Sequence, residues 1–239
     1  MKNELKSLVA DLKSHIKTLD EDDCLPAGAA LHKTSPKSKE IESVLDEVKK
    51  CRKCRLGLSR LNPVFGVGSL NAKAMFIGEG PGYEEDHKGE PFVGKAGQLL
   101  DRILAAIGLS RKTVYIANIV KCHPMVNPEA PEARGNDRQP LPEEISACRP
   151  YLDEQIRVIK PVCIVALGAV SARALLGRND GISALRGKWY DYPCDIFGQA
   201  ETIKLLPTYH PAAILRNPSL KKDAWTDMKM LKAFLEKNR

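Results

Sequence analysis

Four of the seven cysteines are spaced in a way that could hold a metal. Cys51 and Cys54 form a C-x2-C pair, Cys122 follows an apolar stretch, and Cys148 lies in a helical stretch further along. Four thiolates could close a site for zinc or for a [4Fe–4S] cluster, and the spacing alone favours neither. The alternative is that Cys122 and Cys148 are small hydrophobic side chains of the core.

The remaining cysteines have no partner at a suitable spacing. Cys163 lies inside an apolar stretch and is interpreted as a core residue, whereas Cys24 and Cys194 stay unassigned. Residues 1–17 carry charges throughout, which argues against a secretory signal and predicts a cytoplasmic protein. Because that compartment is reducing and the number of cysteines is odd, we expect no disulfide framework.

A second set of polar residues directly follows apolar stretches. The segments GEGPGYEED, KCHP and HPAAILRNP begin at residues 78, 121 and 210. Glu79 and Glu85 are candidate carboxylates, Asn118 offers a donor and an acceptor side by side, and His210 could donate to a developing negative charge. The alternatives are a solvated acidic turn, a buried asparagine that bonds the backbone, and a surface histidine.

The elements that must position these residues follow from the hydrophobic pattern. Apolar stretches predict buried strands at residues 74–78, 114–120, 162–168 and 202–210. Helical patterns cover residues 40–50, 97–107, 142–159, 169–176 and 222–237, with Pro150 as a kink or break. Continuous apolar strands that alternate with helices indicate a three-layer α/β/α fold with a central four-stranded parallel sheet. Functional loops of such sheets lie at the carboxyl ends of the strands.

The chain divides into an extension and a domain. Residues 3–19 have the spacing of an amphipathic helix, and residues 20–39 read as a linker, so we assign residues 1–39 to an N-terminal helical extension and residues 40–239 to the domain. The sequence contains no run of 18 apolar residues, which argues against a membrane span. A net charge of +7 is compatible with nucleic acid but is a weak signal alone.

Taken together, the motifs resemble family 4 uracil-DNA glycosylases. The GEGPG segment at 78–82, with EED at 84–86 and PFVG at 91–94, resembles the first active-site motif of that family. YIANIVKC at 115–122 resembles its uracil-reading strand, and HPAAILR at 210–216 resembles its second motif and DNA-inserting loop. The four spaced cysteines resemble its [4Fe–4S] ligands, which places iron–sulfur above zinc. The resemblance extends from about residue 44 to residue 236.

This resemblance implies an enzyme that acts on uracil in single- or double-stranded DNA. It would be a monofunctional glycosylase, and we expect a monomer. The implied catalytic residues are His210, Glu79 and Asn118, and the implied metal ligands are Cys51, Cys54, Cys122 and Cys148. The implied uracil-binding residues are Gly78, Glu79, Gly80, Glu85, Phe92, Asn118 and His210. Leu215 and Arg216, together with Ile214, are the implied DNA contacts, through an apolar wedge and a phosphate contact.

The residue types suit these roles. Asn118 can donate to uracil O4 and accept from N3–H, whereas cytosine presents the reverse pattern. Phe92 could stack on a base that has left the helix, although a core aromatic is the simpler reading of a lone phenylalanine. His210 could donate to uracil O2. Glu85 would shape the pocket near the position at which thymine carries its methyl group.

Two features depart from the family pattern. The segment PEAPEARGND at 128–137 lengthens the loop between Cys122 and Cys148, and Gly80 stands where many members have alanine. Some glycosylases use an aspartate at the motif position of Gly80 to orient water. In this sequence the candidates for activating water are therefore Glu79, backbone groups or substrate phosphates.

Two other functions stay open at this level. A family X-like protein would form a stable adduct with uracil-DNA, but that type has GEQPG and a histidine in a basic insertion, and residues 125–138 contain no histidine. A non-enzymatic, cluster-containing DNA-binding module would use the basic residues near Cys51 and those after residue 215, which could equally be solvated. The partner of the N-terminal helix is unknown.

Overall fold

A computed structural model describes residues 35–192 and 202–238. The helix predicted over residues 3–19 and the residues Cys24 and Cys194 lie outside the described residues. The strands are β1 (Val67–Gly68), β2 (Ala74–Gly78), β3 (Tyr115–Asn118), β4 (Cys163–Leu167), β5 (Tyr190–Asp191) and β6 (Lys204–Thr208). The longer helices are α2 (Pro36–Lys50), α5 (Lys95–Ala106), α6 (Pro142–Ile159), α7 (Ala169–Leu176) and α10 (Lys221–Lys237). Short helices are α3 (Leu56–Ser59), α4 (Tyr83–Lys88), α8 (Ile182–Leu185), α9 (Pro211–Arg216) and a 3₁₀ turn, Pro218–Leu220.

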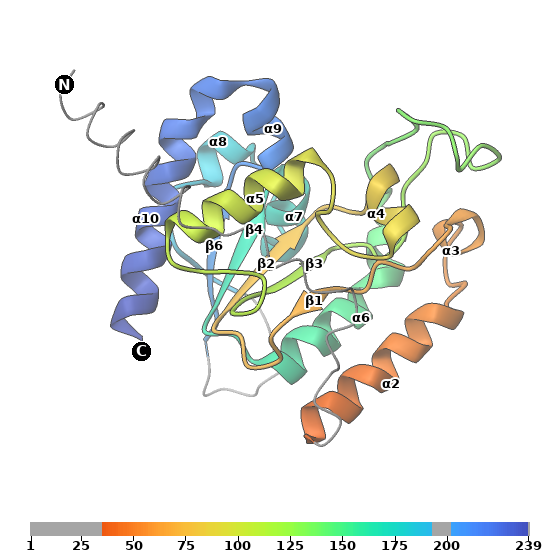
Figure 1. Ribbon diagram of the computed structural model, residues 1–239, viewed down its shortest axis with the longest axis horizontal. Helices are drawn as coiled ribbons and strands as arrows, with labels where there is room; N and C mark the ends of the chain where they lie inside the picture. The colour runs from red at the N-terminus through yellow and green to blue at the C-terminus, as the bar shows by residue number, and fades with distance from the viewer. Residues whose placement is uncertain (1–34, 193–201, 239) are drawn as a thin grey trace, which may run out of the picture. The chain divides into compact units, whose positions relative to one another are not determined.

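The sheet is six-stranded and mixed, in the order β1-β3-β2-β4-β6-β5. Figure 1 shows the sheet with β2 and β4 at its centre. Its four central strands are parallel, as the sequence predicts. β2 has the predicted bounds, and β3, β4 and β6 are slightly shorter than predicted. The prediction of four strands in total is wrong, because β1 and β5 pair antiparallel at the two edges. Each edge strand has two residues, which is too short to give a hydrophobic period.

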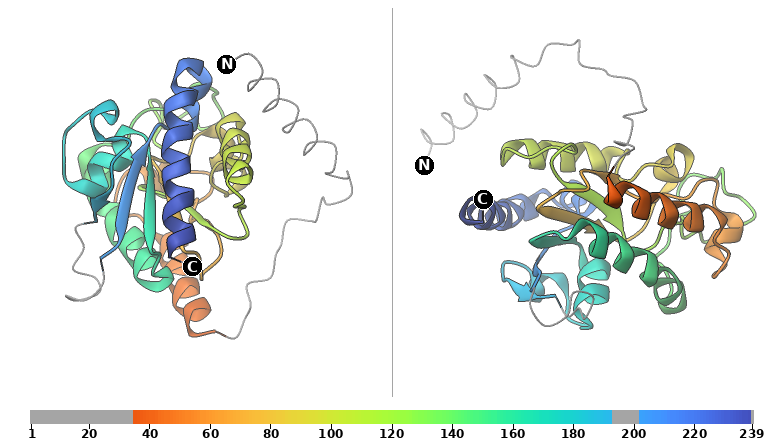
Figure 2. Two further views of the ribbon diagram at one scale, coloured as in Figure 1. Left: turned by 90° about the vertical axis from the view of Figure 1, so that its left-hand side faces the viewer. Right: turned by 90° about the horizontal axis from the view of Figure 1, so that it is seen from below.

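Helices cover both faces of the sheet (Figure 2). Alternate residues of β2 point to opposite faces, so Met75 and Ile77 pack with α2 and α6 while Phe76 packs with α5 and α10. The predicted three-layer arrangement is therefore confirmed for the described residues. None of the described helices is long and apolar enough to cross a membrane.

One helix begins earlier than predicted, and another keeps its predicted bounds with a proline inside it. α2 begins at Pro36 rather than near residue 40, because the Ser35 hydroxyl caps it by accepting from the Ser38 backbone N–H at 3.2 Å. α6 has the predicted bounds, Pro142–Ile159, and continues through Pro150, so the alternative of a break at this residue is wrong. Residues on both sides of Pro150 are buried in α6, including Cys148 and Leu152, and this packing holds the helix together.

Parallel pairing brings the carboxyl ends of the central strands to one edge of the sheet. Gly78 at the end of β2 pairs with Asn118 at the end of β3. Gly168 follows β4, and His210 lies two residues after β6. The residues with candidate chemistry thus come from four different strand ends and meet at one place, as the rule for such sheets predicts.

Candidate active site

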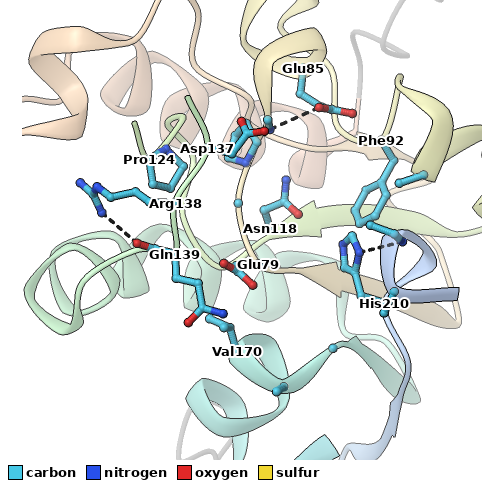
Figure 3. A pocket seen from close by; sticks show the side chains of 18 of the residues that line it. Glu79, Glu85, Phe92, Asn118, Pro124, Asp137, Arg138, Gln139, Val170 and His210 are labelled. Atoms are coloured by element: carbon cyan, nitrogen blue, oxygen red, sulfur yellow. Dashed lines mark hydrogen bonds between the residues drawn. The ribbon is translucent and has the colours of Figure 1, made fainter. Parts of the chain in front are cut away.

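A cavity of about 620 Å³ opens at the carboxyl ends of the strands (Figure 3). Its lining includes seven of the residues singled out by sequence: Glu79, Gly80, Glu85, Phe92, Asn118, His210 and Arg216. The structure therefore brings the separated motifs together at one cavity. Gly78 is not part of the lining, but it lies against two lining residues, Asn118 and Phe92.

Asn118 has an acceptor without a partner. Its side chain is 2% exposed, and the buried Oδ1 atom has no hydrogen-bond partner within the described structure. A Cβ on Gly78 would lie 2.4 Å from this Oδ1 and 2.6 Å from Cζ of Phe92, so glycine is required for both side chains to occupy their places. A buried acceptor left unpaired costs about 1–3 kcal/mol, which is the signature of a group that waits for a ligand donor.

Phe92 is held in a strained backbone conformation. Its φ is +56°, in the left-handed region that side-chain-bearing residues rarely occupy. The Arg111 guanidinium donates to the carbonyl oxygens of Pro91 and Phe92, and Arg111 Nε donates to Asp101 Oδ1 at 2.7 Å. A Cβ on Gly97 would lie 1.6 Å from the Phe92 carbonyl oxygen, so α5 can approach this peptide only through glycine. Strain supported from several sides is typical of a functional loop.

His210 has a defined tautomer. It caps α9, and its Nδ1 accepts from the Ala212 backbone N–H at 3.1 Å, so the proton of the neutral ring is on Nε2. Burial, together with the nearby positive charge of Arg216, lowers the pKa of His210 to about 4. The ring centroids of His210 and Phe92 are 5.5 Å apart, and Gly168 (φ +94°) leaves room for the His210 Cβ. His210 is therefore a neutral donor beside the aromatic ring.

The two glutamates of the first motif have different settings. Burial raises the pKa of the Glu79 carboxyl, which lines the cavity between Asn118 and Gln139 in Figure 3. The Glu85 carboxylate accepts backbone N–H groups of Gly82, Val93 and Gly94 at 3.2, 2.9 and 3.1 Å. Glu85 thus ties the first motif to the Phe92 loop, a clamp that the sequence did not suggest.

The loop after His210 presents one apolar side chain to solvent rather than two. Leu215 is 43% exposed, whereas Ile214 is 2% exposed and packs with Tyr209 and Ala224. The expectation that Ile214 could wedge into DNA is therefore wrong, because the short helix α9 turns it into the core. Arg216 is exposed at the rim of the cavity.

A histidine that sequence reasoning passed over lies in the lengthened loop. His123 is wholly buried; its Nε2 bonds Asp137 Oδ1 at 2.6 Å, and its Nδ1 lies 3.6 Å from Asp86 Oδ2. Burial disfavours a charge on His123, but the two aspartates outweigh burial and raise its pKa to about 9. The residue was visible in the KCHP segment, but its partners depend on how the loop folds back.

The same loop docks against α4 and forms one wall of the cavity. Glu132 bonds His87 at 2.7 Å, and Arg134 pairs with Glu84 at 3.0 Å while lying over the Tyr83 ring. Its last part adds Asp137, Arg138 and Gln139 to the cavity lining. Sequence reasoning missed these lining residues, and also Pro124, Gly168, Ala169, Val170, Ile182 and Tyr209.

The four spaced cysteines line a second, smaller pocket, between the end of α2, α3 and α6. Arg60 Nη1 donates to Cys122 Sγ at 3.0 Å, and the Lys121 backbone N–H donates to Cys148 Sγ at 3.3 Å. Burial raises the pKa of the Cys122 thiol to about 12 and also raises that of Cys148. Cys163 is fully buried in β4, as expected for a core residue.

Comparison with known proteins gives a consistent answer. A model of the uracil DNA glycosylase superfamily matches residues 65–230. The chain is 42% identical over 200 residues to a type-4 uracil-DNA glycosylase of Thermotoga maritima, covering 82% of this chain and 95% of that protein. It is 43% identical over 200 residues to one of Saccharolobus solfataricus (82% and 86% covered) and 40% identical over 195 residues to one of Archaeoglobus fulgidus (80% and 91% covered). The chain therefore belongs to the uracil DNA glycosylase superfamily and, within it, to the type-4 uracil-DNA glycosylases.

Proposed function

We propose that this protein releases uracil from DNA by hydrolysing the N-glycosidic bond of deoxyuridine, which leaves an abasic site. The observation that carries the proposal is the buried Oδ1 of Asn118, which has no hydrogen-bond partner among the described residues and lies near the Phe92 ring and the neutral His210. The acceptor of Asn118 and the donor of His210 complement the N3–H donor and the O2 acceptor of uracil. The glycosidic carbon is not accessible in a stacked duplex, so the nucleotide must first leave the helix.

Recognition follows from the Asn118 amide. Its Oδ1 accepts from uracil N3–H, and its Nδ2 donates to O4. Cytosine has an acceptor at N3 and a donor at the neighbouring position, so it would leave buried groups on both partners unpaired. Phe92 stacks on the base, a contact that contributes about 1–3 kcal/mol in other base–aromatic pairs.

Bond cleavage places negative charge on uracil and positive character on the sugar. The electrons of the C1′–N1 bond pass to uracil, and His210 Nε2–H donates to O2, where the charge develops. Water then bonds to C1′, and the proton that it loses ends on the uracil anion, which leaves as neutral uracil. Gly80 carries no side chain at the position used by some glycosylases to orient water, so we assign this task to the Glu79 carboxylate, which also stabilises the sugar cation.

We assign DNA contacts to the loop after His210. Leu215 is exposed and apolar, which suits insertion into the gap that the displaced nucleotide leaves. Arg216 at the cavity rim suits a phosphate contact. Gly78, Gly80 and Glu85 shape the base pocket through the close approaches and the clamp described above.

The four cysteines suit a [4Fe–4S] cluster, and we propose that they hold one. Cys51, Cys54, Cys122 and Cys148 line one pocket. Two of their sulfurs accept N–H donors, Cys122 from Arg60 and Cys148 from Lys121, as cluster-ligating sulfurs commonly do. Within residues 35–192 and 202–238, no three His, Cys, Asp or Glu side chains are arranged to hold a single metal ion. A cluster does not need the sulfurs to converge on one point, because each of its four irons takes one cysteine. When bound, such a cluster supplies a covalent cross-link among these segments.

Replacing any one of the four cysteines with serine is expected to bleach the protein and lower its melting temperature. The buried thiols lose their protons when they bind iron, and the free energy of cluster binding adds to the stability of the folded state. A variant that cannot bind the cluster loses this stabilisation. Visible absorption and iron content of anaerobically purified protein measure the loss. Cys24→Ser is the matched control and should keep both colour and stability, whereas a colourless wild type with bound zinc would contradict the cluster.

The function is tested by incubating the protein with uracil-containing oligonucleotides. We expect free uracil and an abasic site from single- and double-stranded DNA, detected by chromatography and by alkaline strand cleavage. No release by protein with an intact cluster would refute the proposal. A heat-stable protein–DNA band would favour the adduct-forming alternative. That type uses a histidine in its insertion, and residues 125–138 contain none.

A further inference from the structure

A buried lysine lies between the uracil-reading asparagine and the cysteine pocket. Lys121 is 1% exposed and lines that pocket together with the four cysteines. Its side-chain Nζ donates to the Asn118 carbonyl oxygen at 2.9 Å. Its backbone N–H donates to Cys148 Sγ at 3.3 Å, and the next residue along the chain is Cys122. One residue thus contacts both the base reader and the proposed cluster ligands.

The position of Nζ is fixed from a third side. Lys121 Nζ donates to Gln155 Oε1 at 2.6 Å, and Gln155 is fully buried in α6. Gln155 Nε2 in turn donates to the Phe65 carbonyl oxygen at 2.9 Å and to the Tyr115 hydroxyl at 3.1 Å. Because the amide of Gln155 is bonded at both ends, it cannot rotate without losing these contacts, so it holds Nζ toward Asn118.

Lys121 has no carboxylate partner in the described part of the chain. Its two side-chain acceptors are a carbonyl oxygen and an amide oxygen. A buried ammonium group is costly unless a negative charge lies nearby. Cys122 and Cys148 supply that charge when they bind iron as thiolates, so the setting of Lys121 makes physical sense with the cysteine pocket filled.

We propose that Lys121 is a positioning residue that couples the cysteine pocket to the uracil-reading Asn118. The inference rests on the proposed function and goes beyond it, because it gives the pocket a part in base recognition. Nζ holds the backbone of Asn118, which aims the amide at the base, while the neighbouring Cys122 anchors the same segment at the cysteine pocket. Disturbing the link would therefore loosen Asn118 and slow the chemical step.

The test is a mutant cycle on anaerobically purified holoprotein. Lys121→Met keeps most of the side-chain length and removes both Nζ hydrogen bonds. We expect it to retain iron and visible absorption and to lower the single-turnover rate of uracil release roughly 10- to 100-fold, the loss of one or two buried hydrogen bonds. In an Asn118→Ala background the same change should have an effect of less than about threefold, because its target is already gone.

Matched variants keep the test independent of a general loss of structure. Tyr115→Phe removes one bond of Gln155 and leaves Lys121 with both acceptors, so its rate should stay within about threefold of wild type. Gln155→Leu removes the group that orients Nζ, and this variant replaces Lys121→Met in the test if Lys121→Met does not fold. Its effect on the rate should also largely disappear in an Asn118→Ala background.

Three results would overturn the inference: an unchanged rate in Lys121→Met, an equal loss with and without Asn118, or a loss that follows iron content in proportion. Each of these requires an active wild type. A wild type that releases no uracil would instead refute the proposed function, so the two failures are distinguishable.

Discussion

Replacing Asn118 with alanine is expected to lower the rate of uracil release by about 10²- to 10⁴-fold, since two hydrogen bonds to the base are lost inside a buried site. Asn118 is 2% exposed, and its Oδ1 has no other partner in the described structure, so the whole effect falls on the substrate complex. Single-turnover kinetics on a uracil-containing oligonucleotide measure the rate. Affinity for DNA should change little, because phosphate contacts dominate it.

The free protein should be no less stable after this change. Alanine removes an unsatisfied buried acceptor, so we expect the melting temperature to stay the same or to rise. The matched control is Asn136→Ala. The Asn136 amide bonds Asn127 and Ala130 within the loop, so this variant should lose stability while the chemical step is retained. A rate for Asn118→Ala within threefold of wild type would mean that another group reads the base.

The sequence was sufficient for the parts of the fold that depend on continuous apolar stretches. The run at 74–78 is β2 with the same bounds, and the other predicted strands contain β3, β4 and β6. The rule on carboxyl ends then places Asn118 and His210 at one edge. The edge strands β1 and β5 could not be predicted, because pairing with a neighbour, rather than any local pattern, defines a two-residue strand.

The candidate site was predictable in its side chains and not in its supports. Glu79, Phe92, Asn118 and His210 belong to motifs, and all line the cavity. The Glu85 clamp, the Arg111 contacts to the Phe92 loop and the His123 pair with Asp137 join residues far apart in the sequence. Neither hydrophobic periodicity nor motif spacing predicts contacts between residues so far apart in the sequence. Ile214 was misplaced for a related reason: its burial depends on how α9 packs against Tyr209 and Ala224.

These supports share a physical logic. The Phe92 backbone is strained, and the carboxylate of Glu85 and the guanidinium of Arg111 bond the peptides on either side of it. Gly78 and Gly97 remove the atoms that would prevent the close approaches. The neutral tautomer of His210 is likewise set by a backbone N–H, that of Ala212. The site is therefore organised before substrate arrives, which is what electrostatic stabilisation of a transition state requires.

Replacing His210 with alanine is expected to slow uracil release by about 10²- to 10³-fold, the usual loss when a donor to a developing charge is removed. Because His210 also caps α9, alanine removes a cap as well as a donor. His210→Asn separates the two effects, since asparagine is a good N-cap residue and cannot place a donor at the position of Nε2. We expect both variants to be similarly slow and the asparagine variant to be the more stable.

The pH dependence follows from the lowered pKa of His210. Burial brings this pKa to about 4, below the ordinary value of 6.5, so the unfolded chain binds a proton there at a higher pH than the folded chain does. The free energy of unfolding therefore rises with pH between about 4 and 6.5, and this stability is lost as the pH falls through that window. The part of this pH dependence that comes from His210 should be absent in His210→Asn. The chemical step should likewise show no loss from His210 between pH 8 and 5, because the ring stays neutral and Nε2–H stays available. A rate that climbs as the pH falls from 7 to 5 and flattens in His210→Asn would mean that the charged ring is the active form.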